Sequence, residues 1–405
     1  MAYGLLGRKL GHSWSPSIHA KLGTVPYTLF EAEPEDVESF LRTTDLTAMN
    51  VTIPYKKDVL PFCTELSDTA KKLGSVNTLV KHADGWHGDN TDYYGFTYMV
   101  KQSGISVSGK KCLVLGSGGA SLTVIQALKD MDAADVIVIS RSGENNYENL
   151  YKHADAGVIV NTTPVGMYPH NGEAAVSLDD FPKCEGVLDL IYNPKLTKLL
   201  MDAEVRSIPH AGGLTMLVAQ AKRAAELFTG TSIDDAVIPQ ITRKLQKQMD
   251  NIVLIGMPGC GKTTVAAALS EALQMEVVDA DAEIVKAAGK TIPEIFAEGG
   301  ENAFRKIETD VLSQLGKRTG IILSTGGGCV TKKENYPLLH QNGTIVWLKR
   351  EIGTLPTDGR PLSQRNDLHE MYRIRKPLYE SFADATVENN DTLESTINSL
   401  LEAIK

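Results

Sequence analysis

The sequence predicts an α/β protein with three structural units: an N-terminal α/β domain, a Rossmann-like domain and a P-loop domain with a parallel sheet. Two segments carry this prediction, residues 110–131 and 251–275, in which a short apolar run is followed by glycines and then by apolar residues at helical spacing. A third observation is that strand and helix patterns also alternate over the first 100 residues. The two glycine segments share no repeat period, so each is expected to begin its own sheet.

The individual elements follow from the apolar runs and their boundaries. In the first 100 residues, strands are predicted at Tyr3–Leu6, Ala48–Ile53 and Thr78–Val80, and a helix at Pro34–Leu41. Later strands are predicted at Cys112–Leu115, Val136–Ile139, Val277–Asp281 and Ile321–Leu323. Residues Ile241–Asp250 are polar and charged and lack Gly and Pro, so they are expected to form the exposed end of a helix that serves as a short linker.

The composition excludes several classes of protein. Hydrophobic residues make up 42% and charged residues 22% of the 405 positions, which is ordinary for a globular chain. The net charge is −9 and neither half is basic, so no nucleic-acid partner is expected. No apolar stretch approaches roughly 18 residues, so no membrane span is expected. Five cysteines without a CxxC pair favour a reduced, cytoplasmic protein without structural zinc.

The second glycine segment predicts a nucleotide site. Residues 256–263, GMPGCGKT, fit the pattern G-x-x-x-x-G-K-[ST] between a strand and a helix. The glycines allow backbone N–H groups to surround a phosphate, Lys262 can reach the β- and γ-phosphates, and Thr263 can ligate Mg²⁺. The predicted nucleotide-binding residues are Gly256, Gly259, Gly261, Lys262, Thr263 and Thr264.

The residues that follow narrow the choice among P-loop proteins. In chain order, they are the acids at the end of Val277–Asp281, the segments Ile295–Glu301 and Phe304–Glu308, the glycines Gly326–Gly328, and the segments Gly359–Leu362 and Arg375–Tyr379. In this order they resemble shikimate kinase over nearly all of residues 251–405. The resemblance implies phosphorylation of shikimate by Mg-ATP.

The side chains suit a substrate that is a small polyol with a carboxylate. Arg305 and Arg375 can bind the carboxylate by charge-assisted hydrogen bonds, unless they are ordinary surface charges. Gly327 and Gly328 let the backbone approach the ring. Asp281 can orient or deprotonate the attacking hydroxyl, although it could instead cap the following helix.

The metal and the lid complete the predicted kinase site. Asp279 is expected to hold Mg²⁺ through water, together with Thr263. Arg360 resembles the lid arginine that closes on the transferred phosphate. The sequence departs from the family in two places: Val285 stands where an acid is frequent, and the lid, Glu351–Arg360, is short and has no second arginine before Arg360.

The first glycine segment predicts a dinucleotide site. The predicted cofactor-binding loop consists of Gly116, Gly118, Gly119 and Ala120. The strand Val136–Ile139 is followed by Ser140-Arg141-Ser142, where an NAD-binding protein places an acid. Because Arg141 suits a 2′-phosphate, NADP is favoured over NAD.

The segments around this loop resemble shikimate dehydrogenase across residues 1–245. In order, they are Gly11–His19, Asn50–Lys56, Gly74–Thr78, Gly88–Asp92, Asn161–Met167, Asp189–Tyr192 and Gly213–Gln220. The resemblance implies reduction of 3-dehydroshikimate to shikimate by NADPH. Lys56 is the expected acid and electrostatic stabiliser of the oxyanion, and Asp92 is expected to pair with it.

The remaining residues of the predicted dehydrogenase site bind substrate or cofactor. Expected substrate-binding residues are Ser13, Ser15, Thr52, Asn77, Tyr192 and Gln220. Ser13 or Ser15 could instead cap a helix that starts near Pro16. Residues expected at the cofactor are Arg141, Asn161, Thr163, Gly213 and Met216. Only 19 residues separate Arg141 from Asn161, so a βα unit of the Rossmann domain is expected to be trimmed.

Together these patterns predict a bifunctional enzyme of aromatic amino-acid biosynthesis, acting on small molecules. The predicted domains are a substrate domain at 1–100 completed by helices from about 214–245, an NADP domain at 101–213, a linker at 242–250 and a kinase domain at 251–405. Two alternatives remain for the first half. It could be a quinate/shikimate dehydrogenase that uses NAD, or a dehydrogenase-like domain without catalysis that serves an active kinase.

Overall fold

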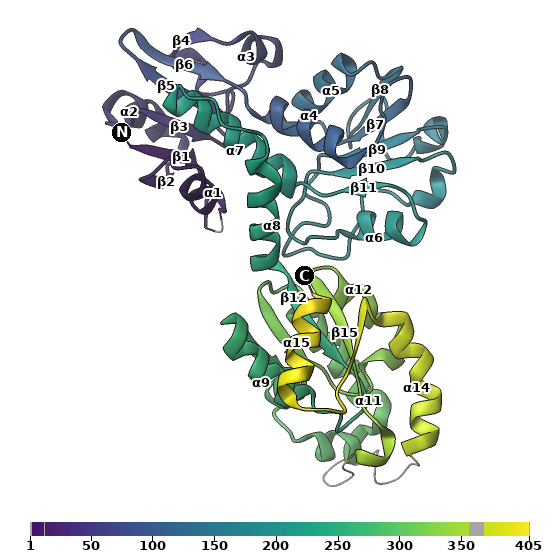
Figure 1. The fold of residues 1–405 in the computed structure, drawn as a ribbon. Helices are drawn as coiled ribbons and strands as arrows, with labels where there is room; N and C mark the ends of the chain where they lie inside the picture. The colour runs from purple at the N-terminus through teal and green to yellow at the C-terminus, as the bar shows by residue number, and fades with distance from the viewer. Residues whose placement is uncertain (1, 12, 356–367, 405) are drawn as a thin grey trace. The chain divides into compact units, whose positions relative to one another are not determined.

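The computed structural model describes residues 2–11, 13–355 and 368–404. The chain divides into two compact units, which are described separately (Figure 1). Unit 1 comprises Met1–Met167, Glu173–Tyr192 and Leu199–Leu245, and unit 2 comprises Tyr168–Gly172, Asn193–Lys198 and Gln246–Lys405. None of the helices in the described ranges is both long and apolar enough to serve as a membrane span.

The first sheet of unit 1 is mixed and has six strands in the order β2-β1-β3-β5-β6-β4. Its strands are β1 (Tyr3–Gly7), β2 (Tyr27–Glu31), β3 (Ala48–Val51), β4 (Cys63–Leu66), β5 (Thr78–His82) and β6 (Gly85–Asp89). Its helices are α1 (Ser15–Lys21), η1 (Pro34–Asp36), α2 (Val37–Thr43), η2 (Leu60–Phe62) and α3 (Asp68–Leu73). Strand β5 runs antiparallel to both β3 and β6, whereas β1 is parallel to β2 and β3.

Several predicted boundaries in this region were wrong, since β1, β5 and α2 also run on to Gly7, His82 and Thr43, and two of the differences have a clear local cause. The strand predicted to reach Ile53 ends at Val51, and the chain then enters a turn that carries Lys56. The predicted helix at Pro34–Leu41 begins as the 3₁₀ turn η1 and becomes α-helical only at Val37. Proline has no N–H to donate, so it is tolerated in a first turn.

The second sheet of unit 1 is parallel throughout, in the order β11-β10-β9-β7-β8. Its strands are β7 (Lys111–Leu115), β8 (Asp135–Ile139), β9 (Val158–Asn161), β10 (Gly186–Asp189) and β11 (His210–Ala211). The helices around it are α4 (Asp92–Ser103), α5 (Gly119–Asp130), η3 (Leu150–His153), η4 (Leu178–Asp180) and α6 (Lys198–Val205). Only the short 3₁₀ helix η3 lies between β8 and β9, where the sequence spacing predicts a trimmed unit.

Helix α7 (Leu214–Thr229) packs against α1 and against strands β3 and β5, and most extensively against α4. Gly95 lies at the α4–α7 crossing, where an added Cβ would be only 2.7 Å from the Met216 carbonyl oxygen and 2.9 Å from Gln220 Cβ. This close approach brings Gln220 up to the first turn of α4.

Helix α8 (Val237–Met249) carries the chain from unit 1 into unit 2. The prediction of an exposed helix end holds for one face only. Leu245 and Met249 are buried, whereas Lys244 and Lys247 are exposed.

Unit 2 contains a five-stranded parallel sheet in the order β13-β14-β12-β15-β16. Its strands are β12 (Asn251–Ile255), β13 (Glu276–Asp279), β14 (Ile321–Ser324), β15 (Gly343–Lys349) and β16 (Ala385–Glu388). Its helices are α9 (Lys262–Leu273), α10 (Ala280–Ala288), α11 (Ile292–Leu315), η5 (Cys329–Thr331), α12 (Asn335–His340), η6 (Ile352–Thr354), α14 (Leu368–Phe382) and α15 (Leu393–Ala403). Helices α9 and α15 pack together on one side of the sheet, and α12 and α14 lie on the other (Figure 1).

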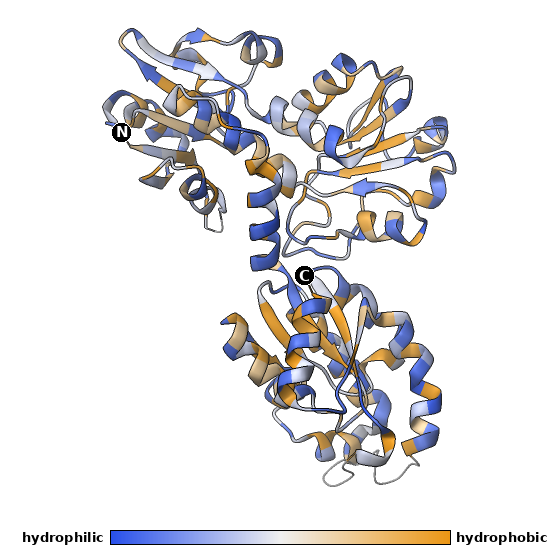
Figure 2. Cartoon of the chain, in the orientation of Figure 1, coloured by the Kyte–Doolittle hydropathy of each residue, from blue (hydrophilic) through white to orange (hydrophobic). Residues whose placement is uncertain are grey.

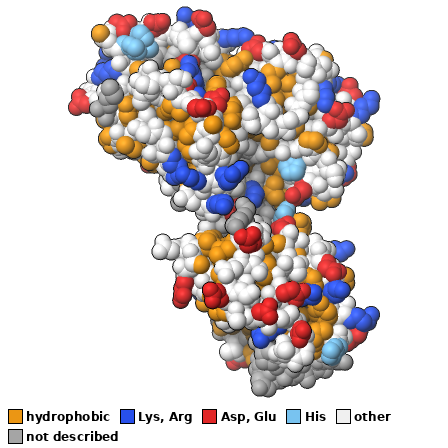
Figure 3. Space-filling view, viewed as in Figure 1, with side chains coloured by type: hydrophobic (Ala, Val, Ile, Leu, Met, Phe, Trp, Pro, Cys, Tyr) orange, Lys and Arg blue, Asp and Glu red, His pale blue; other side chains and the backbone are white. Residues whose placement is uncertain are grey.

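The hydrophobic effect places apolar residues on the central strands of the parallel sheets, as Figure 2 shows. Strand β12 is buried at all five positions, and so is most of β7. On the face seen in Figure 3, acidic and basic side chains are interspersed among hydrophobic ones. The buried central strands fix the positions of the loops at their carboxyl ends, where ligands of parallel α/β sheets bind.

Replacing Gly95 by Ala is expected to destabilise unit 1 by about 1–3 kcal/mol, because the methyl group overpacks the α4–α7 crossing. In an open helix the same change would stabilise by about 1 kcal/mol. The measurement is denaturant unfolding monitored by hydrogen exchange in α4 and α7. Gly157→Ala is the control, since a Cβ there meets only the flexible Lys110 side chain at 3.4 Å. A Gly95→Ala protein as stable as this control would contradict the packing argument.

Candidate active sites

The first candidate site centres on an ion pair between Lys56 and Asp92. Lys56 lies in the turn after β3, and Asp92 is the first residue of α4. The Lys56 Nζ and Asp92 Oδ2 atoms are 2.5 Å apart, with side-chain exposures of 20% and 13%. Both groups are therefore largely withdrawn from water yet open on one side, which strengthens their interaction and leaves the ammonium accessible.

A hydrogen-bond network holds this pair in place. The Asn77 Oδ1 atom accepts from the Thr91 backbone N–H at 2.7 Å, and Asn90 Oδ1 accepts from the Asp92 N–H at 3.2 Å. The Thr91 hydroxyl also lies 3.4 Å from Gln220 Oε1. The structure thus brings Asn77, Asp92 and Gln220 to the N-terminal turn of α4. The side-chain carbonyl oxygen of Asn77 already accepts a hydrogen bond from the Thr91 backbone N–H.

The two serines lie at the N-terminus of α1. The Ser13 Oγ atom accepts from the Ser15 N–H at 3.3 Å, and Trp14, the N-cap residue, makes no side-chain cap bond.

Thr52 and Tyr192 are the other predicted substrate-binding residues of this unit. Thr52 lies just after β3 and Tyr192 just after β10, and both are half-buried. Burial raises the pKa of Tyr192.

The cofactor loop leads from β7 into α5. Gly118 is the N-cap residue, and the first turn has neither a side-chain cap nor an acidic residue. The backbone N–H groups of Gly119 and Ala120 are therefore free to bind an anion, which fits the pyrophosphate of a dinucleotide. Arg141 is exposed directly after β8.

Asn161, predicted at the cofactor, has a buried side chain that is engaged by other residues of the chain. It is 1% exposed, its Oδ1 accepts from the Thr163 N–H and hydroxyl, and its Nδ2 donates to Asp189 at 3.0 Å. A buried amide needs such partners, so Asn161 shapes the loop that carries Thr163, which is half-buried.

Two further predicted cofactor residues also have packing roles. An added Cβ at Gly213 would lie 2.0 Å from the Leu190 carbonyl oxygen, so close packing requires glycine there. Met216 is 9% exposed and belongs to the apolar core that contains Phe96 and Val114.

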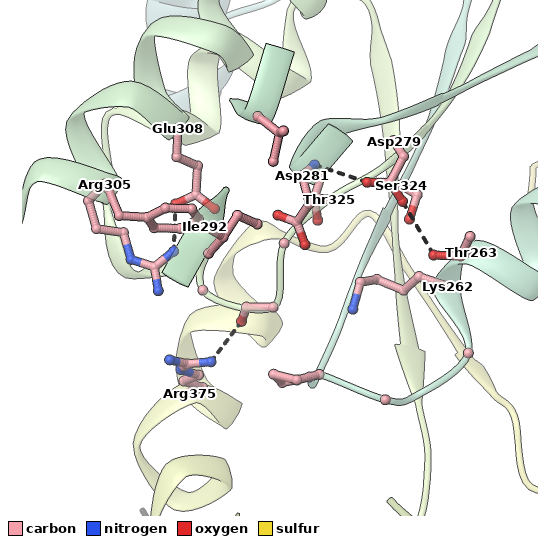
Figure 4. A pocket seen from close by; sticks show the side chains of 18 of the residues that line it. Lys262, Thr263, Asp279, Asp281, Ile292, Arg305, Glu308, Ser324, Thr325 and Arg375 are labelled. Carbon is pink, nitrogen blue, oxygen red and sulfur yellow. Dashed lines mark hydrogen bonds and ion pairs between the residues drawn. The ribbon is translucent and has the colours of Figure 1, made fainter. Parts of the chain in front are cut away.

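The second candidate site is a cavity of about 690 Å³ in unit 2. Figure 4 shows its labelled side chains converging from the P-loop, α10, α11, β14 and α14. The predicted residues that line it are Gly259, Gly261, Lys262, Thr263, Thr264, Asp279, Asp281, Arg305, Gly327, Gly328 and Arg375. Val285 also lines the cavity. Arg360 lies outside the described residues.

The P-loop end of the cavity contains Lys262 and Thr263. The Lys262 Nζ donates to the carbonyl oxygens of Gly256 and Met257, at 2.9 and 3.1 Å. The Thr263 hydroxyl lies 3.3 Å from Asp279 Oδ2. A hydroxyl and a carboxylate oxygen so placed beside a phosphate loop fit the donor set that Mg²⁺ prefers.

Asp279, not Asp281, caps the helix that follows β13. The Asp279 Oδ1 atom accepts from the backbone N–H groups of Asp281 and Ala282. The strand predicted over Val277–Asp281 therefore ends at Asp279, because its carboxylate starts α10. Burial, followed by the nearby Asp279 charge, raises the pKa of Asp281.

The other end of the cavity holds two arginines with different partners. Arg305 is 4% exposed and donates to Glu308 at 2.6 Å and to Glu301 at 3.0 Å. Gly328 permits this position, because a Cβ there would lie 1.9 Å from Arg305 Nη2. Arg375 donates to the Gly327 carbonyl oxygen at 3.1 Å.

Several pocket residues were missed by sequence reasoning. Glu308 is fully buried, and burial raises its pKa. Glu308 follows Arg305 by three positions on helix α11, and this spacing could have indicated that the two side chains pair. Arg350 also lines the cavity, and no local pattern in the sequence indicates it. Behind the lining, Tyr379 of the segment Arg375–Tyr379 donates to the Gly327 carbonyl, and Asn389 donates to the Cys260 carbonyl.

Comparisons with known proteins match each part of the chain separately. The shikimate kinase family model matches residues 258–405, and that of the shikimate dehydrogenase substrate binding domain matches residues 5–79. A shikimate dehydrogenase (NADP(+)) of Clostridium perfringens is 34% identical over 265 residues, covering 60% of this chain and 98% of that protein.

Solved structures agree with this similarity. A chorismate mutase/shikimate 5-dehydrogenase fusion protein from Clostridium acetobutylicum has a TM-score of 0.58 and 38% identity, covering 61% of this chain and 97% of its own. Shikimate 5-dehydrogenase from Thermus thermophilus, in complex with NADP(H) and shikimate, has a TM-score of 0.54 and 28% identity, covering 60% and 99%.

Replacing Glu308 by Ala is expected to destabilise unit 2 by about 3–5 kcal/mol, because it leaves the buried Arg305 charge without its closest partner. Glu301→Ala is the matched control. It removes a partner of the same arginine whose side chain is 47% exposed, and it should cost less than about 1 kcal/mol. Hydrogen exchange in β12 and β14 measures the stability of unit 2 by itself. Equal losses for the two variants would show that burial does not set the strength of the pair.

Proposed function

Because the chain belongs to the shikimate dehydrogenase family and continues into a shikimate kinase domain, we propose that it catalyses two successive reactions. The first is reduction of 3-dehydroshikimate to shikimate with NADPH, and the second is phosphorylation of that shikimate by ATP. The chain is an NADP-dependent oxidoreductase and an ATP- and Mg²⁺-dependent kinase. The product of one unit is thereby the substrate of the other.

The Lys56–Asp92 pair is the observation that carries the dehydrogenase reaction. NADPH, when bound, supplies the hydride that reduces the substrate ketone. The Lys56 ammonium stabilises the negative charge that develops on the ketone oxygen and gives it a proton. Asp92 orients Lys56 through their ion pair, and this pair argues against a dehydrogenase-like domain without catalysis.

The residues that we propose to bind the substrate and NADP are assigned from their positions in unit 1. Ser13, Ser15, Thr52, Asn77, Tyr192 and Gln220 bind the carboxylate and ring hydroxyls of the substrate. The free N-terminus of α5 binds the pyrophosphate of NADP, and Arg141 the 2′-phosphate. We assign residues 1–100 and the helices from about 214–245 to the substrate domain, 101–213 to the NADP domain, 242–250 to the linker and 251–405 to the kinase.

In the kinase reaction, Asp281 takes the proton of the attacking hydroxyl. Its raised pKa makes it a better base than an ordinary aspartate, because burial and Asp279 disfavour its charge. Lys262 exchanges its backbone carbonyl partners for phosphate oxygens. Thr263 and Asp279 would hold Mg²⁺, which neutralises phosphate charge when bound. Arg305 and Arg375 bind the shikimate carboxylate.

Lys56→Ala is expected to lower the turnover of 3-dehydroshikimate by a factor of about 10²–10⁴, because the developing oxyanion loses its proton donor. The measurement is NADPH oxidation by the full chain, with NADH and quinate as comparisons. The neighbouring, exposed Lys57→Ala is the control, and phosphorylation of added shikimate should be unchanged in both variants. Unaltered turnover in Lys56→Ala would exclude the proposed acid.

Asp281→Asn is expected to lower kinase kcat by a factor of about 10²–10⁴. In the unsubstituted chain, kinase activity should fall as the pH drops through the raised pKa of Asp281, so the acid limb lies above the roughly 3.9 of a free aspartate. The check is a pH profile of kcat/KM for shikimate phosphorylation. An acid limb at or below that value, or full activity in Asp281→Asn, would refute the assignment.

A further inference from the structure

The cavity of unit 2 contains an arginine that the proposed kinase steps do not use. Arg350 directly follows β15 and lines the cavity. Its Nη1 atom lies 3.9 Å from the position that a Cβ on Gly261 would occupy. The guanidinium group is therefore held over the phosphate loop rather than at the Arg305–Arg375 end of the cavity.

Arg350 differs from the other two arginines of the cavity in its partners. Arg305 is engaged by Glu301 and Glu308, and Arg375 by the Gly327 carbonyl. Within the described part of the chain, Arg350 has neither a hydrogen bond nor an ion pair. A guanidinium has five N–H donors, so Arg350 presents an unused, positively charged fork to whatever occupies the P-loop.

The surroundings of Arg350 also favour an anion. Gly261 is the N-cap residue of α9, and that helix start has no side-chain cap and no acid in its first turn. The Asn389 side chain donates to the Cys260 carbonyl at 2.7 Å and braces the loop from the same side. Free N–H groups, the helix dipole and the guanidinium therefore converge on one region.

We propose that Arg350, at the carboxyl end of β15, binds the phosphates of a nucleoside di- or triphosphate in the P-loop. The cation is supplied by the residue that directly follows β15. A guanidinium suits phosphate because it can donate two parallel hydrogen bonds to it. The inference rests on the proposed kinase function, whose nucleotide site it completes.

The test is calorimetric titration of the full chain with ADP and, separately, with adenosine. Arg350→Gln should weaken ADP binding by about tenfold or more and leave adenosine binding unchanged. The ADP affinity of Arg350→Lys should lie between those of Arg350→Gln and the unsubstituted chain, since lysine keeps the charge and loses the paired N–H donors. Arg373→Gln is the control, because Arg373 is an exposed arginine of the same unit that pairs with Glu370, and it should bind ADP normally.

Equal ADP affinity in Arg350→Gln and the unsubstituted chain would overturn the proposal. An equal loss for ADP and adenosine would overturn it as well, since it would place the guanidinium on the base. Circular dichroism of each variant and shikimate phosphorylation by the unsubstituted chain are measured alongside. If the unsubstituted chain binds ADP without phosphorylating shikimate, the kinase function fails, while the ADP comparison still decides the role of Arg350.

Discussion

Both active sites depend on one constraint, the start of a helix that is left without a side-chain cap. After β7 and again after β12, a glycine occupies the N-cap position, and no acid stands in the first turn. Helices α3, α10 and α15 begin with a side-chain cap, as Asp279 provides for α10, whereas α7 also begins at an uncapped glycine. An uncapped start exposes N–H groups and the positive end of the helix dipole to the site. In unit 2, the other residues of the cavity are arranged around the start of α9.

The cations of the two sites are held in position before any ligand arrives. Asp92 holds Lys56, two glutamates hold Arg305, and backbone carbonyls hold Lys262. Each arrangement offsets the cost of withdrawing a charge from water. It also means that a ligand shares or displaces an existing partner. Arg350 is the exception among the arginines of the kinase cavity as far as the described residues go, which is why it stands out.

Much of the site could be predicted from the sequence because it is encoded locally. The P-loop pattern and the strand before it fix Lys262 and Thr263, and recognisable segments contain Lys56 and Asp92 although the two are far apart in the chain. What could not be predicted depends on tertiary contacts. Asn161 turns inward to Asp189 on a neighbouring strand, whereas the Asp279 cap of α10 is a local contact that the sequence left open between two acids. Glu308 and Arg350 acquire their surroundings only when distant elements pack together.

The uncapped helix starts have a consequence for the lifetime of the protein in the cell. With glycine in place of Ser, Thr, Asp or Asn at the N-cap, each of these two helices forgoes roughly a few tenths of a kcal/mol. Nucleotide and dinucleotide bind the folded chain and not the unfolded one, so they restore that free energy by mass action. Resistance of each unit to proteolysis then follows the cellular concentration of its own coenzyme. A shortage of either coenzyme is then expected to shorten the lifetime of the unit that binds it.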